Sequence, residues 1–536
     1  MISLFKGKSN TIASAAVIVA SFSILSRLVG FIRDRILAGT FGAGDNLDVY
    51  FAAFRIPDFL FQLIVVGALS ASFIPLFTKY YSKDKENEAW QLTNNILNII
   101  VVIFGVLVLL GILLAPYIAP AIAPGFDAEK QAAVGELSRI MFLAQLFLSV
   151  SMVYGSALQG ARRFVLYSLA PIFYNIGIIS GAVLLAPEMG VAGVAWGVVL
   201  GAVLHLFVQW FGVKTLGYKY KFLFNLKNKD VQYTFKHMLP RIMGLAVNQI
   251  NFLAMTMIAS ALAIGSVTIL QFAYNLNFFP VGVIAVSYAI AAFPSFCEYR
   301  NKDDEAGFIK AFSSTVRQMF FFIVPATFVF ILLRAQIVRV VLGAGMFDWE
   351  ATKLTADTLG FFIISLFAQG LIFILARAYF AYSNTITPFL IGVGAAIVNI
   401  VVAILLSRNF GVLGLGIAYS ISSLTQAILL WLLLRRKLGG LDEWHIFKSS
   451  SVLLVAGLLG AVVVQFMKGV VVEYITLNTF FAVFGQGLIA GTAGIFVYGL
   501  VAYLFKSEEM MEFLHGMKRR LFKKAETGET IITNIQ

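Results

Sequence analysis

Long apolar stretches recur along almost the whole chain and are separated by short polar segments. Stretches of 18 or more predominantly apolar residues are typical of membrane-spanning helices, whereas a β-barrel would show short alternating segments. The pattern predicts an all-α polytopic membrane protein with about 14 transmembrane helices. The predicted spans are residues 11–39, 48–79, 89–122, 131–160, 163–187, 190–216, 231–262, 266–298, 306–342, 350–382, 384–407, 411–436, 446–470 and 480–506.

The composition supports this class and excludes several others. Of the 536 residues 60% are hydrophobic and 12% are charged, against about 25% charged in a soluble domain. The single cysteine, Cys297, excludes an internal disulfide, and the four scattered histidines favour no metal site. The first apolar stretch carries Arg27 and Arg33 and has no small-residue cleavage site, so we expect a retained helix and not a signal peptide.

Basic residues account for the net charge of +13 and gather in alternate loops. Cytoplasmic loops of membrane proteins carry an excess of lysine and arginine, so this alternation predicts that both termini are cytoplasmic and that no nucleic acid is bound. The residues concerned are Lys79, Lys83, Lys85, Arg162, Arg163, Lys214, Lys219, Lys221, Lys227, Lys229, Arg300, Lys302, Arg435, Arg436 and Lys437.

An internal repeat divides the predicted spans into two halves. FAAFRIP ends at Pro57 and FAYNLNFFP at Pro280, so they are 280 − 57 = 223 residues apart; GVAG at Gly190 and GVLG at Gly411 are 411 − 190 = 221 apart. We therefore expect two parallel-repeat six-helix lobes around a central site. Duplication retained for folding alone is the alternative. The predicted parts are 1–217 (helices 1–6), 228–437 (helices 7–12), 446–506 (helices 13 and 14) and a cytoplasmic tail, 507–536.

Charged residues in the first two spans are the candidate binding site. Charges inside spans are costly and usually face a cavity or a partner, and arginine presents a planar fork that suits phosphate oxygens. The cluster therefore favours a bound anion; mutual ion pairing that fixes the two helices is the alternative. The candidate residues are Arg27, Arg33, Asp34, Asp48 and Arg55.

The second half offers fewer candidates. Arg241, Asn275 and Arg377 are the candidate cavity residues there, although Arg377 would also fit the cytoplasmic end of its helix. Helix-breaking and small residues predict hinges or gates, with simple packing as the alternative. They are Gly39, Gly42, Pro57, Gly67 and Pro280. The chain has no P-loop, no HExxH and no Gly-rich nucleotide loop, so we expect neither an enzyme nor a bound cofactor.

Four segments resemble the MurJ (MviN) lipid II flippases of the multidrug/oligosaccharidyl-lipid/polysaccharide exporter superfamily. They are SRLVGFIRD (Ser26–Asp34), FGAGDNLD (Phe41–Asp48), FAAFRIPDFL (Phe51–Leu60) and GALSASFIP (Gly67–Pro75). The resemblance implies a protein of the bacterial cytoplasmic membrane that moves undecaprenyl-pyrophosphate-linked peptidoglycan precursor, lipid II, to the outer leaflet by alternating access. It implies that arginines bind the pyrophosphate and that the last two helices form a groove for the lipid tail.

The chain also departs from the family pattern. The family commonly has arginine where this chain has Phe61 and Asn275, and an acidic residue where it has Val66. A flippase for another polyprenyl-linked glycan, of the O-antigen or teichoic-acid type, therefore remains an alternative. So does a non-transporting scaffold that binds proteins of cell-wall synthesis. A drug exporter is disfavoured because its cavity should be acidic. Membrane potential or an ion gradient would bias the transport.

Overall fold

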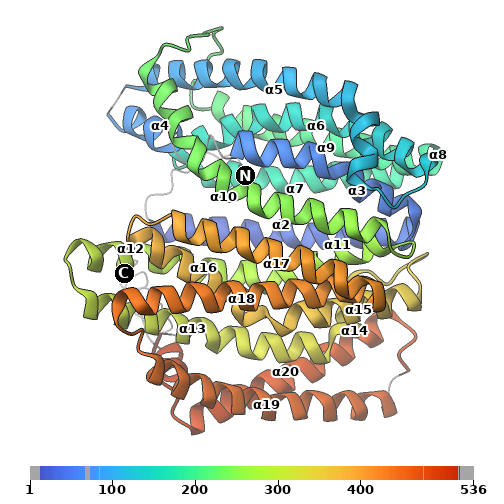
Figure 1. The fold of residues 1–536 in the computed structure, drawn as a ribbon, viewed down its shortest axis with the longest axis vertical. Helices are drawn as coiled ribbons and strands as arrows, with labels where there is room; N and C mark the ends of the chain where they lie inside the picture. Colours follow the sequence, from blue (N-terminus) through green and yellow to red (C-terminus); the bar gives the residue numbers. More distant parts are fainter. Residues whose placement is uncertain (1–11, 67–72, 84, 475, 517, 519–536) are drawn as a thin grey trace, which may run out of the picture. The chain divides into compact units, whose positions relative to one another are not determined.

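The computed structural model describes residues 12–66, 73–83, 85–474, 476–516 and 518, without the side chains of 12–18, 64, 66 and 237–241. Within these ranges the regular elements are all helical, as the apolar pattern predicts (Figure 1). In chain order they are α2 (Ile12–Phe41), α3 (Asp45–Phe61), η1 (Gln62–Val66), α4 (Ile74–Tyr81), α5 (Glu86–Ile122), α6 (Ala128–Gly160), α7 (Phe164–Ser180), η3 (Gly181–Leu185), α8 (Ala186–Met189), α9 (Val191–Lys214), α10 (Lys229–Ser260), α11 (Ser266–Pro280), η4 (Val281–Ala285), α12 (Val286–Asn301), α13 (Glu305–Leu332), α14 (Arg334–Val341), α15 (Trp349–Ile364), α16 (Leu366–Ala381), α17 (Ile386–Phe410), α18 (Val412–Leu438), α19 (Glu443–Tyr474) and α20 (Phe480–Leu504).

The helices identify a multi-pass membrane protein. In the described part of the chain 11 helices are long and apolar enough to cross a membrane, or 12 when one bent pair is counted as a single span. The expected number of about 14 is therefore not confirmed. Neither α2 nor α3 is among the 11: α2 carries Arg27, Arg33, Asp34 and Arg35, and α3 has only 17 residues.

Two predicted spans are interrupted. The expected span 306–342 consists of α13 and α14, separated at Leu333, and 350–382 consists of α15 and α16, which meet at a 46° bend. At this bend the carbonyl of Phe362 accepts hydrogen bonds from the side chains of Ser365 and Gln369. The break is stable because side chains replace the lost helical donors, a substitution that apolar periodicity does not reveal.

Contacts divide the chain into two compact units. The first comprises the described residues up to 272 together with 341–358 and 396–418, and the second comprises 273–340, 359–395 and the described residues from 419 onward. The division into repeat lobes at 217 and 228 concerns sequence similarity and stays a prediction.

The first unit is built around α6, which packs against α5 and α9, while α7 packs against α9 and α2 (Figure 1). Close approach of α7 and α9 depends on glycine, because a Cβ atom at Gly177 would lie 2.2 Å from the Cα atom of Gly201. Small residues at such crossings let helix backbones touch, which is how apolar helices associate when no water is excluded.

At four prolines inside helices, a side chain of a neighbouring helix donates to the carbonyl that the proline leaves without its helical donor. A proline lacks the N–H that would bond the carbonyl four residues earlier. For Pro57 in α3 that carbonyl belongs to Ala53, and the hydroxyl of Ser138 on α6 donates to it at 3.1 Å. A buried hydrogen bond from another helix therefore satisfies the carbonyl that Pro57 leaves without its helical donor.

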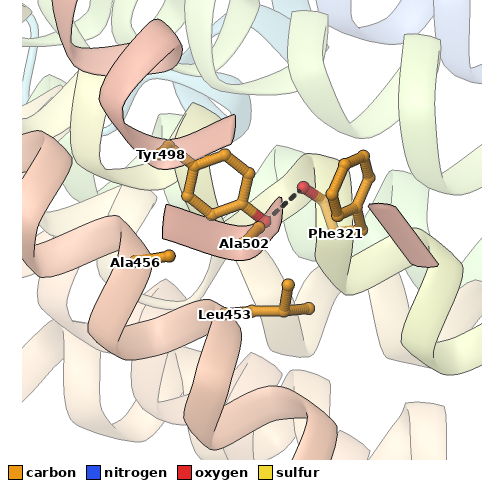
Figure 2. Close-up of a cluster of buried hydrophobic side chains, with 5 residues drawn as sticks. All are labelled: Phe321, Leu453, Ala456, Tyr498 and Ala502. Atoms are coloured by element: carbon orange, nitrogen blue, oxygen red, sulfur yellow. Dashed lines mark hydrogen bonds between the residues drawn. The ribbon is translucent and has the colours of Figure 1, made fainter. Parts of the chain in front are cut away.

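The same arrangement recurs at three more prolines. In the first unit the carbonyl of Ile112, orphaned by Pro116, accepts from Arg139, and that of Tyr167, orphaned by Pro171, accepts from Gln209. In the second unit Pro325 of α13 orphans the carbonyl of Phe321. The hydroxyl of Tyr498 on α20 donates to that carbonyl at 2.8 Å, beside the buried side chains of Leu453, Ala456 and Ala502 (Figure 2).

Candidate functional site

Arg33 is the centre of the charged cluster in the first unit. Its Nε and Nη2 atoms donate to Oδ1 of Asp34 at 3.0 and 2.7 Å, and Nη1 donates to Oδ1 of Asn175 on α7 at 3.0 Å. Asn175 is oriented in turn because its Nδ2 donates to the carbonyl of Pro171. These contacts use three of the five N–H groups of a guanidinium. The Arg33 side chain is 23% exposed, and two N–H groups of its guanidinium are not used in these contacts.

The rest of α2 extends this cluster along one side of the helix. Asp34 is 3% exposed, and Arg27, which is partly buried, precedes it by seven residues. Seven residues are close to two helical turns, so Arg27 and Asp34 share a face about 10 Å apart along the axis. The structure therefore brings Arg33 and Asp34 together and places Arg27 on the same helix face as Asp34.

Arg55 on α3 has other partners. Its Nε donates to Oγ1 of Thr256 on α10 at 2.7 Å, its Nη2 donates to Oε1 of Gln271 on α11 at 2.8 Å, and its guanidinium lies 5.9 Å from the ring centroid of Phe252. Both of these hydrogen-bond acceptors are neutral, and the contacts orient the guanidinium; Asp58 on the same helix interacts with it electrostatically. Sequence reasoning did not find Thr256, which looks like an ordinary helix residue.

Asp48 holds backbone groups at the start of α11. Its Oδ2 accepts from the N–H of Gly265 at 2.7 Å, and its Oδ1 accepts from the N–H and the hydroxyl of Thr268 at 2.8 and 2.6 Å. The carboxylate is 2% exposed and stabilises the N-terminal end of that helix. Both of its oxygens thus accept hydrogen bonds within the protein, whereas Arg33 uses three of its five N–H groups in this way.

Near Asp48 three turns of the first unit meet backbone to backbone. The carbonyl of Gly39 accepts from the N–H of Met346 at 2.9 Å. Gly42 has φ +67°, and a Cβ atom there would lie 2.9 Å from the carbonyl oxygen of Met346; Gly265 has φ +88°, and its Cβ would lie 2.4 Å from that of Ala43. These glycines therefore allow a tight closure that larger residues would prevent.

The proline candidates lie beside π-helical turns. Pro57 lies in α3, which continues directly into η1, and Pro280 is the last residue of α11 and directly precedes η4. π-helical turns add a residue to the helix and are frequent at functional sites. Gly67 lies outside the described residues. The hinge role of all five candidates stays a prediction.

The remaining candidates of the second half are less well placed. Asn275 lies partly buried on α11, and the guanidinium of Arg377 on α16 lies 5.3 Å from the ring centroid of Phe293. The side chain of Arg241 lies outside the described residues. Asn277, two residues after Asn275 and fully buried, donates from Nδ2 to Oε1 of Gln369 at 2.9 Å within the second unit.

The sequence analysis did not identify a second charged cluster, which is formed by one arginine and two glutamates. Arg317 on α13 donates from Nη1 to Glu508 and Glu509 at 2.8 and 2.5 Å, in the segment that follows α20. Ser449 on α19 also donates to Glu509, and His445 contacts Glu508. Burial alone would raise the pKa of Glu508, but the hydrogen bonds from His445 and Arg317 outweigh it and hold that pKa below its usual value. An arginine inside an apolar span, with a glutamate pair just after the last span, was the available signal.

Comparison with known proteins decides the family. The family model described as lipid II flippase MurJ matches residues 37–485, which is most of the chain. The chain belongs to the MurJ family. Across the described residues, no group of three or more metal-ligating side chains is arranged to hold a metal ion.

Individual relatives agree with this assignment. A probable lipid II flippase MurJ of Haemophilus influenzae is 30% identical over 82% of this chain and 89% of its own length. A solved lipid II flippase MurJ in an inward closed conformation has a TM-score of 0.76 at 24% identity, over 91% of this chain and 98% of that one. An inward-facing multidrug resistance MATE transporter has a TM-score of 0.66 at 14% identity, over 80% and 99%. These two structures establish the fold, and the MurJ family is one of inner-membrane lipid transporters.

Proposed function

We propose that this chain is a lipid II flippase, which moves the undecaprenyl-pyrophosphate-linked peptidoglycan precursor from the inner to the outer leaflet by alternating access. Membership of the MurJ family supports the substrate. The observation that carries the proposal for the site is the Arg33 guanidinium, which Asp34 and Asn175 hold by three N–H groups. A partly exposed, oriented guanidinium among apolar helices suits the oxygens of a pyrophosphate.

Each candidate has a part in this proposal. Arg33 and Arg27 bind the pyrophosphate, and Asp34 orients Arg33. Arg55, held by Thr256 and Gln271, adds positive charge, as do Arg241 and Arg377 in the second half, where Asn275 offers a neutral donor. Asp48 acts on the conformational cycle, because its hydrogen bonds to Gly265 and Thr268 stabilise the state in which the turns near Gly42 are packed together.

Charged residues and the charge of the substrate bear on the topology of the chain in the membrane and on the driving force of transport. We infer that both termini are cytoplasmic, because the basic loops alternate along the chain. Membrane potential biases the transport, since moving one charge across it is worth about 2.3 kcal/mol per 100 mV. No cofactor takes part in this proposal.

Complementation of a strain depleted of its lipid II flippase tests the function. Wild-type chain should restore growth, and the variant Arg33→Ala should not, although it should reach the membrane in equal amount. Failure of the wild-type chain, with its membrane insertion verified, would reject the lipid II assignment.

The residues at two positions, Phe61 and Asn275, favour a second candidate substrate, a polyprenyl-linked glycan other than lipid II. Phe61 is 8% exposed in the protein interior, and Asn275 is neutral, so neither supplies the cation that relatives commonly have. A proteoliposome assay that compares labelled lipid II with O-antigen-type and teichoic-acid-type polyprenyl glycans separates the two proposals. Transport of another glycan in preference to lipid II would establish the alternative, and transport of none would favour a scaffold that binds proteins of cell-wall synthesis.

A further inference from the structure

The segment that joins α9 to α10 is held in an extended conformation along α5 (green, beside α5 in Figure 1). Asn94, Asn95 and Asn98 of α5 are at most 4% exposed. Their Nδ2 atoms donate to alternate backbone carbonyls of the segment at 3.0 to 3.3 Å, namely those of Lys219, Lys221, Leu223 and Asn225. Alternate carbonyls point to one side only in an extended chain, so the asparagines fix both its conformation and its orientation.

The segment that these asparagines hold carries large apolar side chains that are exposed. Phe222 is 73% exposed, Tyr220 58%, Leu226 52% and Phe224 45%. They lie outside the apolar spans, where exposure to water would be unfavourable by about 25 cal/mol per Å² of apolar surface. A contiguous exposed apolar run of this kind marks a surface that another phase or molecule covers.

The charges of the segment indicate what covers it. Residues 214–229, which we call the lysine–aromatic strip, include Lys214, Lys219, Lys221, Lys227 and Lys229, all exposed, and no aspartate or glutamate. The ammonium group of Lys214 lies 4.7 Å from the ring centroid of Trp210 in the last turns of α9. Aromatic rings with lysines between them are typical of the interface between lipid tails and anionic headgroups.

The position of the strip in the chain leads to the same surface. It begins where α9 ends and finishes where α10 begins, and each helix contains a candidate membrane span, Val191–Lys214 in α9 and Ile242–Ser260 in α10. Its short length keeps it at the bilayer boundary, and its lysines put that boundary on the cytoplasmic side. We propose that the lysine–aromatic strip docks on anionic phospholipids of the inner leaflet, with Phe222 and Phe224 at the level of the upper acyl chains and the lysines on the phosphates. This surface is independent of the transported substrate.

Fluorescence quenching by lipids tests the proposal on the full-length chain. Cys297 is the only cysteine, so Cys297→Ser provides a background for Phe222→Cys carrying a small fluorophore. The labelled protein is reconstituted with phosphatidylglycerol or phosphatidylcholine that carries a nitroxide near the headgroup, at equal mole fractions. We expect at least twofold stronger quenching by the phosphatidylglycerol nitroxide, since each lysine near an anionic surface favours it by roughly a factor of five.

Two controls make the result specific. In K219Q/K221Q/K227Q the preference for phosphatidylglycerol should fall to a ratio near one, while quenching by both lipids persists. A fluorophore at Asn87→Cys, an exposed position in the first turn of α5, should show little quenching by either lipid. Equal quenching by both lipids in the unaltered lysine background would overturn the anionic preference. Quenching by aqueous iodide alone would show that the strip faces water or a partner protein and would overturn the docking.

Discussion

Arg33 of the first unit and Arg317 of the second are both arginines inside helices, yet their surroundings differ. Arg33 contacts one carboxylate, that of Asp34, and its side chain is 23% exposed. Arg317 contacts two, those of Glu508 and Glu509, and its side chain is 10% exposed. The Arg33–Asp34 pair has no net charge and uses three of the five N–H groups of the guanidinium, whereas Arg317 with its two glutamates carries an excess of negative charge. The number of acidic partners and the exposure of the side chain are therefore the two features on which we propose a binding role for Arg33 and a structural role for Arg317.

The largest expected effect follows from removing Arg33, the proposed pyrophosphate-binding arginine. Arg33→Ala removes the remaining charge-assisted hydrogen bonds to a pyrophosphate, each worth about 1.5–3 kcal/mol, so transport should fall roughly a hundredfold or more. The thermal midpoint should also fall, because the buried carboxylate of Asp34 loses its contact with Arg33, so transport is compared at a temperature at which both proteins are folded. Lipid II transport in proteoliposomes measures the loss. Arg33→Lys serves as the matched control; it keeps the charge without the fork and should restore only part of the activity. Wild-type transport by both variants would remove Arg33 from the site.

The structural arginine should behave in the opposite way. Arg317→Ala leaves Glu509, whose side chain is 3% exposed, without its partner, and breaking a buried pair costs about 3–5 kcal/mol of stability. Thermal unfolding in detergent should show a large drop in midpoint. The double variant Arg317→Leu with Glu509→Leu removes both charges and should recover most of that loss. An unchanged thermal midpoint in Arg317→Ala would show that this cluster contributes no more to stability than a surface ion pair.

A smaller effect is expected at the proline kinks. Ser138→Ala leaves the carbonyl of Ala53 without a donor and should cost about 1–2 kcal/mol. In a Pro57→Ala background the backbone N–H of residue 57 returns, so the same substitution should cost almost nothing. Tyr498→Phe and Pro325→Ala form the corresponding cycle in the second unit. Equal costs of Ser138→Ala in both backgrounds would show that the hydroxyl does not serve the kink.

The smallest effect concerns the orientation of Arg33. Asn175→Ala removes one of its three hydrogen-bonded contacts, worth about 1 kcal/mol, so transport should fall roughly fivefold with the maximal rate less affected than the apparent affinity. Transport measured over a range of lipid II concentrations separates the two. A loss as large as that of Arg33→Ala would mean that Asn175 itself contacts the substrate.

Sequence patterns predicted the helical class and the positions of most spans, and they indicated a charged cluster that contains Arg33 and Asp34 without specifying which residues pair. They did not predict the breaks at Leu333 and Ser365, because apolar periodicity continues through both. Asn175 was also missed, since a single asparagine in a span has no distinguishing spacing. The sequence predicts that Asp48 belongs to the substrate site, from its charge and from its match to the family pattern; only the fold shows that Gly265 and Thr268 donate to its oxygens.

The central claim is that the arginine-rich cluster of the first unit binds the pyrophosphate of a transported lipid. Transfer of labelled lipid II across proteoliposome membranes, measured side by side for the wild-type chain and Arg33→Ala, tests it most directly. We predict transfer by the wild-type chain and a rate near that of empty liposomes for Arg33→Ala, at equal reconstitution and at a temperature at which both proteins are folded. Equal transfer by the two proteins, or none by a well-folded wild-type chain, would contradict the account.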